Sequence, residues 1–319
     1  MLINLGLSAN LHLQDHLALM AALLVSTGFI LFQRRRKKTK LSVVLRALFH
    51  PRIWLSPSSL MDFKYYFAGI FIFSSGVVYV SLSNAKISEW VYALLNSHIG
   101  ERDAHTTLGV YAYIIIIFVL YIAIEFGFWI DHYLSHKVPF LWEFHKVHHA
   151  ATVLTPFTNF RIHPVNVIIF VNIMAVVVGS TNGVIYYVFG KELAMSAVLG
   201  TNILLLCYMA LYGHLQHSQV WIPFTGWAGK IFLSPAHHQI HHSNTRQHFD
   251  KNFGMGLAVF DWIFGTLYVP AKHNERIVFG VDNDNYLDRW LPSLCYPLLY
   301  SGRHIYRMFS PSNYKKNPS

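Results

Sequence analysis

Five apolar runs divide this 319-residue sequence, and they approach or reach the length of a membrane span. A transmembrane helix needs about 20 largely apolar residues. The third run is the clearest, because four consecutive isoleucines occupy positions 114–117. The runs are Leu17 to Phe32, Tyr65 to Leu82, Leu108 to Ile130, Val165 to Val178 and Leu193 to Leu211. They predict an all-α integral membrane protein with about four to five membrane-embedded helices.

The last two runs are separated by the stretch Gly-Ser-Thr-Asn-Gly at 179–183. Glycine and small polar residues are typical of a loop, so we expect a break there. We expect the two runs to form a hairpin that enters and leaves on one side of the membrane. The later stretch from Trp290 to Phe309 contains Pro292 and Pro297, which argue against a sixth span and favour an amphipathic interfacial segment.

Basic residues predict the orientation of these spans. Six of them, between Arg34 and Lys40, follow the first run, whereas the loop between the second and third runs has no basic excess. The positive-inside rule places residues 34–60 in the cytoplasm and the N-terminus outside. A cleaved signal peptide would carry its basic residues before the apolar run, so we disfavour that reading. Residues 132–149 and 214–248 then lie on the same, cytoplasmic face.

Composition agrees with a membrane protein. Charged residues make up 13% of the chain, against about 25% in soluble domains. The net charge of +10 suits an anionic inner leaflet, and no nucleic-acid-binding motif is present. We divide the chain into N-terminal transmembrane helices (1–107), a catalytic domain (108–270) and a C-terminal interfacial segment and tail (271–319).

Histidine is the unusual residue: 13 of the 20 histidines fall in the windows 132–163 and 214–248. Their spacing is that of one helix face, at i, i+3 and i+4. The sequence contains two H-x-x-H-H boxes, one H-x-x-x-H pair and one H-x-x-H pair. These ten residues are His132, His136, His145, His148, His149, His214, His217, His238, His241 and His242.

Neutral imidazole is the commonest metal ligand, and ten ring nitrogens suit two metals with open positions better than one. The competing reading, a set of surface histidines, applies best to the seven that lie outside the windows. With only two cysteines, the chain cannot form a Cys-rich metal site. The motif H-E-x-x-H is absent, which argues against a zinc protease. A nitrogen-rich dimetal centre at the edge of a bilayer suggests dioxygen activation by iron. Residue chemistry alone leaves iron, zinc, copper and nickel open.

The histidine boxes lie in longer motifs that resemble the fatty acid hydroxylase/sterol desaturase superfamily, over about residues 108–270. The motifs are Asp131 to His136, Trp142 to His149, Arg161 to Pro164, Ser234 to Ser243, Asp250 to Gly254 and Phe260 to Thr266. The spacing is most similar to bacterial members and to the alkylglycerol monooxygenase branch. The resemblance implies a di-iron oxidase that uses O2 to attack lipid C–H bonds, in a bacterial inner membrane.

The resemblance also implies roles for individual residues. Nine of the ten boxed histidines match ligand positions. His214 is the exception, because the family's third box is often H-x-x-x-H and here position 218 is Ser. The candidates for orienting the ligands or for contacting substrate are His163, His237, Asp250, Asp261, Glu125 and Arg161. Glu125 lies inside a predicted span, and Arg161 is a candidate either for a lipid phosphate or for an interface anchor.

These inferences predict an O2-dependent di-iron lipid hydroxylase. No flavin or NAD(P)H motif is found, so we expect electrons from a separate donor protein, and we assign no catalytic group beyond the metal centre. One alternative is a desaturase with the same metal core. Another is a histidine-rich metal-binding or transport protein, although the spans carry few polar residues to line a pathway. The sequence leaves the lipid and the oligomeric state open.

Overall fold

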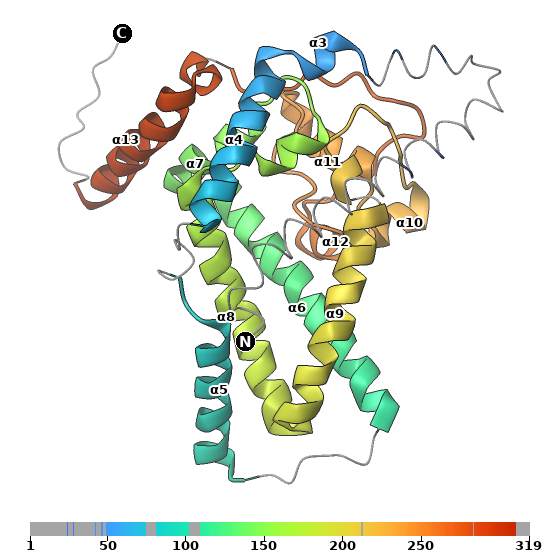
Figure 1. The fold of residues 1–319 in the computed structure, drawn as a ribbon, viewed down its shortest axis with the longest axis vertical. Coiled ribbons are helices and arrows are strands. Elements are labelled where there is room, and N and C mark those ends of the chain that lie inside the picture. Colours follow the sequence, from blue (N-terminus) through green and yellow to red (C-terminus); the bar gives the residue numbers. More distant parts are fainter. Residues whose placement is uncertain are drawn as a thin grey trace.

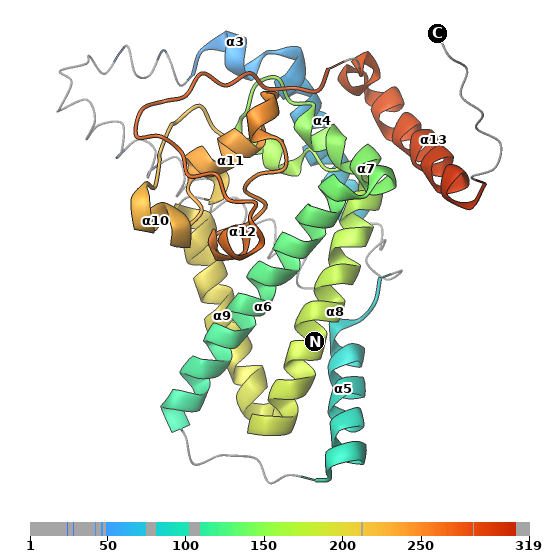
Figure 2. The same ribbon diagram turned by 180° about the vertical axis from the view of Figure 1, so that it is seen from behind.

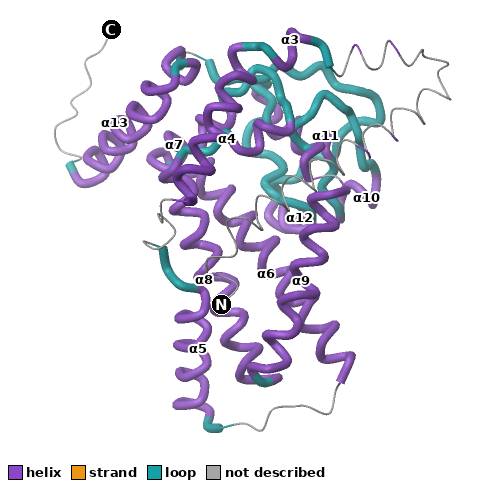
Figure 3. The backbone as a smooth tube through the Cα atoms, in the orientation of Figure 1, coloured by secondary structure: helices purple, strands orange, loops and turns teal. Residues whose placement is uncertain are grey.

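The structure of the chain, a computed structural model, describes residues 49–74, 81–101, 109–211, 213–282 and 284–310, with a few isolated positions before residue 49. This part is helical (Figure 3), and its only strand-like pairings are two isolated bridges, Phe232 with Leu257 and Ser243 with Phe279. The predicted all-α class is confirmed for the described residues. The first apolar run, Leu17 to Phe32, lies almost entirely outside them.

Long helices form a stalk, and short helices form a cap at one of its ends (Figure 1). The stalk contains α5 (Asn84–Ile99), α6 (Gly109–Lys137), α8 (Pro164–Phe189) and α9 (Lys191–Leu211). The cap contains α3 (Pro51–Trp54), α7 (Pro139–His149), α10 (Gly226–Ile231), α11 (Pro235–His241), α12 (Val259–Phe264) and the 3-10 turns η3 (Pro156–Phe160), η4 (Gly213–Leu215), η5 (Arg246–His248) and η6 (Asn285–Asp288). The helices α4 (Pro57–Ser74) and α13 (Trp290–Phe309) flank the cap.

Two helices of the described chain, α6 and α8, are long and apolar enough to cross a membrane. Within their most apolar stretches, 33% and 28% of the residues are buried inside the protein. Most of this apolar surface therefore faces outward, as in a helix surrounded by lipid, whereas a core helix of a soluble protein is buried. The expected count of four to five spans is not confirmed, because the described residues supply two helices of this kind.

The predicted hairpin is present, but the predicted break is not. Helix α8 runs from the cap down the stalk and α9 returns to the cap, as Figure 2 shows from behind. The sequence 179–183 lies inside α8, which ends instead at Gly190, a residue with a φ of +85°. Such a φ is readily adopted by glycine and rarely by other residues.

The glycines of α8 serve helix packing. A Cβ on Gly183 would lie 2.5 Å from the Cβ of Val91, and one on Gly179 would lie 2.9 Å from the Cβ of Ile87. Both contacts are with α5, a helix that begins after the N-cap Ser83. The sequence had suggested only a loop between the second and third runs. Two predictions from the sequence were therefore wrong, a break at 179–183 and a loop in place of α5. Both have the same physical reason, because small residues four apart on one helix let a second helix approach closely.

Helix α13 runs through both of its prolines. Pro292 lies in the first turn, where few backbone N–H groups are needed, and Pro297 lies inside the helix. Its exposed apolar residues include Leu298, Leu299 and Phe309. The expectation that the prolines interrupt this segment was therefore wrong, and residues 290–309 form one continuous helix.

Candidate metal centre

The boxed histidines come from separate parts of the chain that meet where the stalk joins the cap. Helix α6 carries His132 and His136 one turn apart near its end. Helix α7 carries His145, His148 and His149, and α11 carries His238 and His241, with His242 as its C-cap. His217 follows the turn η4 at the end of the α8–α9 hairpin. The hairpin thus brings the two histidine windows together, as the sequence predicted.

Nine of these histidines form two groups. The five-histidine group consists of His132, His136, His145, His149 and His241, and the four-histidine group consists of His148, His217, His238 and His242. In each group one nitrogen of every ring lies within 4.8 Å of the others. Neighbouring residues of α7 point into different groups, and so do His241 and His242. Helices α7 and α11 therefore each supply ligands to both groups.

The four-histidine group converges through its Nε2 atoms. The Nε2 of His217 lies 2.9 Å from that of His238 and 3.1 Å from those of His148 and His242. One ring nitrogen carries at most one proton, so it cannot form hydrogen bonds of ordinary quality with three others at once. A divalent cation placed among these four lone pairs would use all of them.

The five-histidine group has the same character. The Nε2 atoms of His132, His145 and His241 are buried and have no hydrogen-bond partner among the described residues. Buried nitrogens that lack partners are costly unless they bind a ligand. The Nε2 atoms of His136 and His149 lie 3.1 Å apart. Both groups fit metal ions, and the absence of sulfur and of carboxylate from them restricts the choice to metals that accept imidazole.

Burial keeps these rings neutral. Desolvation lowers the pKa of His145 to about 4, from an ordinary value of 6.5. It also lowers the pKa of His148, His217 and His242 well below that value, and neighbouring histidines lower them further. A neutral imidazole has a free lone pair, so the groups are prepared to bind metal near neutral pH.

Three rings of the five-histidine group are oriented from behind. The Nδ1 of His132 donates to the carbonyl of Phe253 at 2.8 Å, and the Nδ1 of His241 donates to the carbonyl of Lys251 at 2.8 Å. The Nδ1 of His145 donates to Oδ1 of Asn166 at 3.0 Å. Such bonds fix the tautomer and direct Nε2 toward the metal position. None of these three acceptors was predicted from the sequence. Asn166 was detectable, since it follows the motif Arg161 to Pro164.

The two carbonyls belong to a support loop, residues 250–258, which Asp261 and Glu125 hold in place. The Asp261 carboxylate accepts hydrogen bonds from the backbone N–H groups of Phe253 and Gly254, and from the side chains of Trp129 and Thr266. Glu125 accepts from the N–H groups of Gly256 and Leu257 at 3.0 Å. Both carboxylates act on the histidines through the loop and contact none of the nine.

Asp250 stands closer to the histidines but is not bonded to them. Its Oδ1 lies 3.8 Å from Nδ1 of His136, which is beyond hydrogen-bond length, and Lys137 pairs with its other oxygen. The backbone of Asp250 has a φ of 59° and that of Asn252 a φ of 61°, conformations that Asn and Asp tolerate better than most residues. These two positions set the path of the support loop.

Three other predicted site histidines lie outside both groups. His163 caps α8, accepting from the N–H of Val165, and its Nε2 lies 3.0 Å from the carbonyl of Leu294. His237 forms a capping box with Ser234, and its Nε2 lies 3.0 Å from the carbonyl of Gly229. His214 is fully buried with neither ring nitrogen bonded within the described chain. The expectation that His214 belongs to the ligand set is not met in this arrangement.

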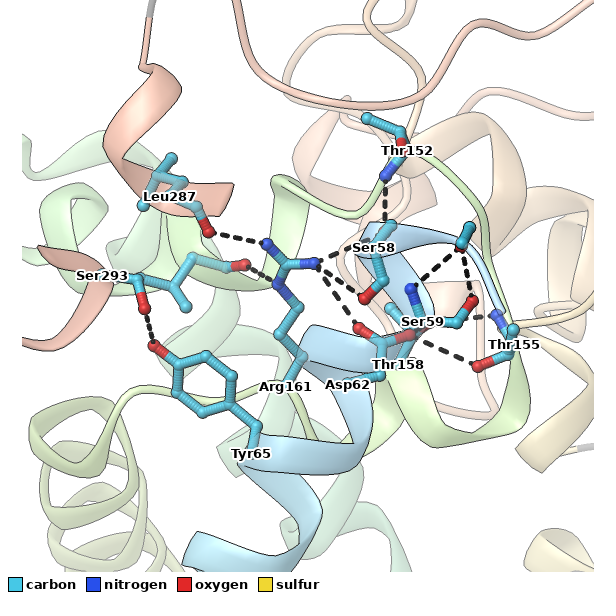
Figure 4. Close-up of polar contacts among 12 residues, drawn as sticks. Ser58, Ser59, Asp62, Tyr65, Thr152, Thr155, Thr158, Arg161, Leu287 and Ser293 are labelled. Atoms are coloured by element: carbon cyan, nitrogen blue, oxygen red, sulfur yellow. Dashed lines mark hydrogen bonds and ion pairs between the residues drawn. The ribbon is translucent and has the colours of Figure 1, made fainter. Parts of the chain in front are cut away.

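Arg161 is fully buried, and Figure 4 shows the polar contacts of its guanidinium group. Its guanidinium donates to the carbonyls of Val147 and Leu287, and lies 3.5 Å from the Asp62 carboxylate. Asp62 in turn accepts from Thr158. A lipid phosphate cannot reach this group, so the phosphate expectation was wrong. The residue is a buried clamp that joins α4, α7, η3 and η6.

Comparisons with known proteins agree with this site. The sequence profile of the family described as "Fatty acid hydroxylase" matches residues 117–266. Human alkylglycerol monooxygenase is 27% identical over 161 residues, which cover 50% of this chain and 32% of that protein. The ornithine lipid hydroxylase OlsE of Rhizobium tropici is 28% identical over 148 residues, covering 46% and 40%. The Delta(7)-sterol-C5(6)-desaturase of Nicotiana tabacum is 24% identical over 175 residues, covering 53% and 55%.

The matches therefore span about a third to a half of these relatives' lengths. No solved structure matches the chain. The profile match begins within α6, ends just after α12, and encloses all nine converging histidines together with the support loop. Over residues 117–266 the chain is therefore similar to the fatty acid hydroxylase family.

Proposed function

We propose that this protein is a lipid hydroxylase of the membrane that binds two iron ions, one in each histidine group. The carrying observation is the convergence of nine neutral imidazoles into two adjacent groups beside apolar helices. The named activities of the relatives, an alkylglycerol monooxygenase and an ornithine lipid hydroxylase, support a lipid substrate. Bound iron would supply the O2 chemistry that side chains lack.

In the proposed reaction a C–H bond of the lipid becomes C–OH. One oxygen atom of O2 enters the product and the other leaves as water, with two electrons and two protons drawn from a separate donor protein. The chain contributes the ordered ligands and the exclusion of water. The aromatic rings of Phe128, Phe253 and Trp142 pack against the site histidines and provide an apolar surrounding.

The proposed location is a multi-pass membrane protein with its site on the cytoplasmic face, in a bacterial inner membrane. Support comes from the basic residues 34–40 after the first apolar run, and from the position of both histidine windows at the ends of α6 and of the α8–α9 hairpin. The substrate classes we consider are fatty acyl, sterol-like and ether lipids.

Desaturation is a second candidate, because one relative is a sterol desaturase. It would remove two hydrogens from the lipid at the same metal centre, while O2 is reduced to two water molecules with two electrons and two protons from the donor protein. A metal transporter is a more distant candidate. The grouped histidines lie near the end of α6 and on the short helices α7 and α11 of the cap, and not along the length of the stalk, which disfavours a transport path.

One experiment tests these proposals together. Metal content is measured on the purified protein, and lipids are compared between cells with and without the gene. We expect two irons per chain and lipids that gain one oxygen. Loss of two hydrogens would favour desaturation, while metal accumulation without lipid change would favour transport. His148→Ala together with His149→Ala should abolish both readouts, and His273→Ala, an exposed histidine far from the groups in sequence, is the matched control.

A further inference from the structure

We infer that the two metal positions are unequal, with the five-histidine group binding its ion more tightly than the four-histidine group. The inference rests on the proposed function, since it assumes that two ions bind. It goes beyond that proposal because it assigns different stability to the two ions and names a residue that sets the difference.

The first observation is the number and attachment of the ligands. The five-histidine group offers one more ring, and three of its rings have a fixed acceptor behind them: the carbonyls of Phe253 and Lys251 and the amide of Asn166. When Nε2 binds a metal, Nδ1 must carry the proton, and each of these acceptors stabilises that tautomer.

The second observation is the rigidity of those acceptors. The carbonyls lie on the support loop, which is held by the buried Asp261 and Glu125 carboxylates. Asn252 adds bonds from its amide to the carbonyls of His237 and Tyr268. Asn166 lies in the first turn of α8 and is buried. The rings of this group are therefore directed before any ion arrives, which reduces the ordering that binding requires.

The four-histidine group lacks this support. The Nδ1 atoms of His148, His217, His238 and His242 are all buried, and none has a hydrogen-bond partner in the described part of the chain. Metal binding through Nε2 leaves a buried N–H on each ring without an acceptor, which is unfavourable. Orienting partners change metal affinity by about 10- to 100-fold, so we expect a difference of at least that order between the two positions.

The test is the release of metal from the loaded, purified full-length protein. The protein is exposed to rising chelator concentrations, retained iron is counted, and the iron-57 Mössbauer spectrum is recorded. We expect two phases of release, with one iron lost at about 10-fold or more lower chelator concentration, and the disappearance of one of two spectral components. His217→Gln should leave a single iron that resists the chelator.

Variants of Asn166 show which histidine group holds the tightly bound iron. Asn166→Ala removes the acceptor for Nδ1 of His145 and should shift the tight phase toward the weak one. Asn166→Asp keeps an oxygen there and should preserve two phases. Asn182→Ala, a change at another buried asparagine of α8, which lies against Asn84, is the matched control and should behave as the parent. Because Asn166→Asp retains the side-chain shape, it separates loss of the acceptor from loss of folding.

The outcomes distinguish the inference from the proposed function. Release of both irons in one phase, or a tight phase untouched by Asn166→Ala, would overturn the inference and leave the proposed function standing. A correctly folded protein that binds no metal in either group would overturn both.

Discussion

Individual buried residues at this site act in pairs of donor and acceptor rather than as isolated charges. The histidines lose their ordinary basicity because burial disfavours the imidazolium, and they gain direction from carbonyls behind them. The carboxylates Asp261 and Glu125 reach none of the rings, yet they fix the loop that orients His132 and His241. The orientation of a histidine ring at this site therefore depends on carboxylates that do not touch the ring.

Acidification should therefore destabilise the metal-free protein. The pKa values of His145, His214 and His237 fall to about 4 in the folded chain, because burial disfavours the charged rings, whereas the ordinary value is 6.5. Between these pH values the unfolded chain binds protons that the folded chain does not, so the free energy of unfolding falls as pH drops through that window.

Thermal unfolding of the chelated protein measures this effect. We expect the melting temperature at pH 5 to be lower than at pH 7 by roughly 5 °C or more. The fall should be complete near the folded pKa of about 4, where both states are protonated. A melting temperature that rises on acidification would contradict the assignment of neutral rings.

The variant Asp261→Asn tests the support loop. The Asp261 carboxylate accepts four hydrogen bonds, and an amide can accept through only one of its two heavy atoms, so some buried donors lose their partner. We expect a loss of about 2–3 kcal/mol in the free energy of unfolding, measured with denaturant on purified protein. Asp288→Asn changes an exposed carboxylate and should cost less than about 0.5 kcal/mol.

At the scale of the elements, close packing between helices fixes the positions of α5, α8 and α9 in the stalk. Helix α5 lies in a groove that Gly179 and Gly183 open on α8, and the hydrogen bond from Asn182 to Asn84 lies between them along the same contact. The far end of α8 turns at Gly190 into α9, whose residues Ala194 and Ala197 pack with Ile116 of α6. These contacts fix the hairpin that returns His217 to the metal centre.

Gly183→Ala should loosen this packing. The added Cβ would meet the Cβ of Val91 at 2.5 Å and the carbonyl of Ser88 at 2.7 Å, and backbone can yield little. We expect a loss of about 1–3 kcal/mol, seen as a lower unfolding midpoint. Gly69→Ala on α4 is the matched control, because nothing lies within 4 Å of its Cβ position. There alanine should be neutral or stabilising, since it favours helix more than glycine does.

Some features of these elements have a signature in the sequence and others do not. Nine converging histidines were predictable from helical spacing and residue type, but their division into two groups and the exclusion of His214 depend on tertiary structure. The continuous helix at 179–183 was not predictable, since the same glycines that suggest a loop are needed for contact with α5, which depends on tertiary structure. The carbonyls of Lys251 and Phe253 have no signature in the sequence, because every residue carries a carbonyl.

Across the whole molecule, the cap is tied together by charges buried far from water. Arg161 joins the carbonyl of Val147, just before His148, to Asp62 on α4 and to Leu287 in η6. Around this clamp pack Met61, Tyr65 and Ala150, which form one apolar core. The position of α7, and with it three site histidines, thus depends on segments from both ends of the described chain.

Breaking the clamp should unfold the cap more readily than any surface change. Arg161→Leu leaves the Asp62 carboxylate buried without its partner, and we expect a loss of about 3–5 kcal/mol in the free energy of unfolding. Adding Asp62→Leu removes the orphaned charge, so the double variant should be more stable than the sum of the single losses implies. The exposed pair Lys191 and Glu89 supplies the contrast: its removal should cost about 0–1 kcal/mol. If Arg161→Leu kept full stability and lost only affinity for anionic lipid, a phosphate-binding role would replace the clamp.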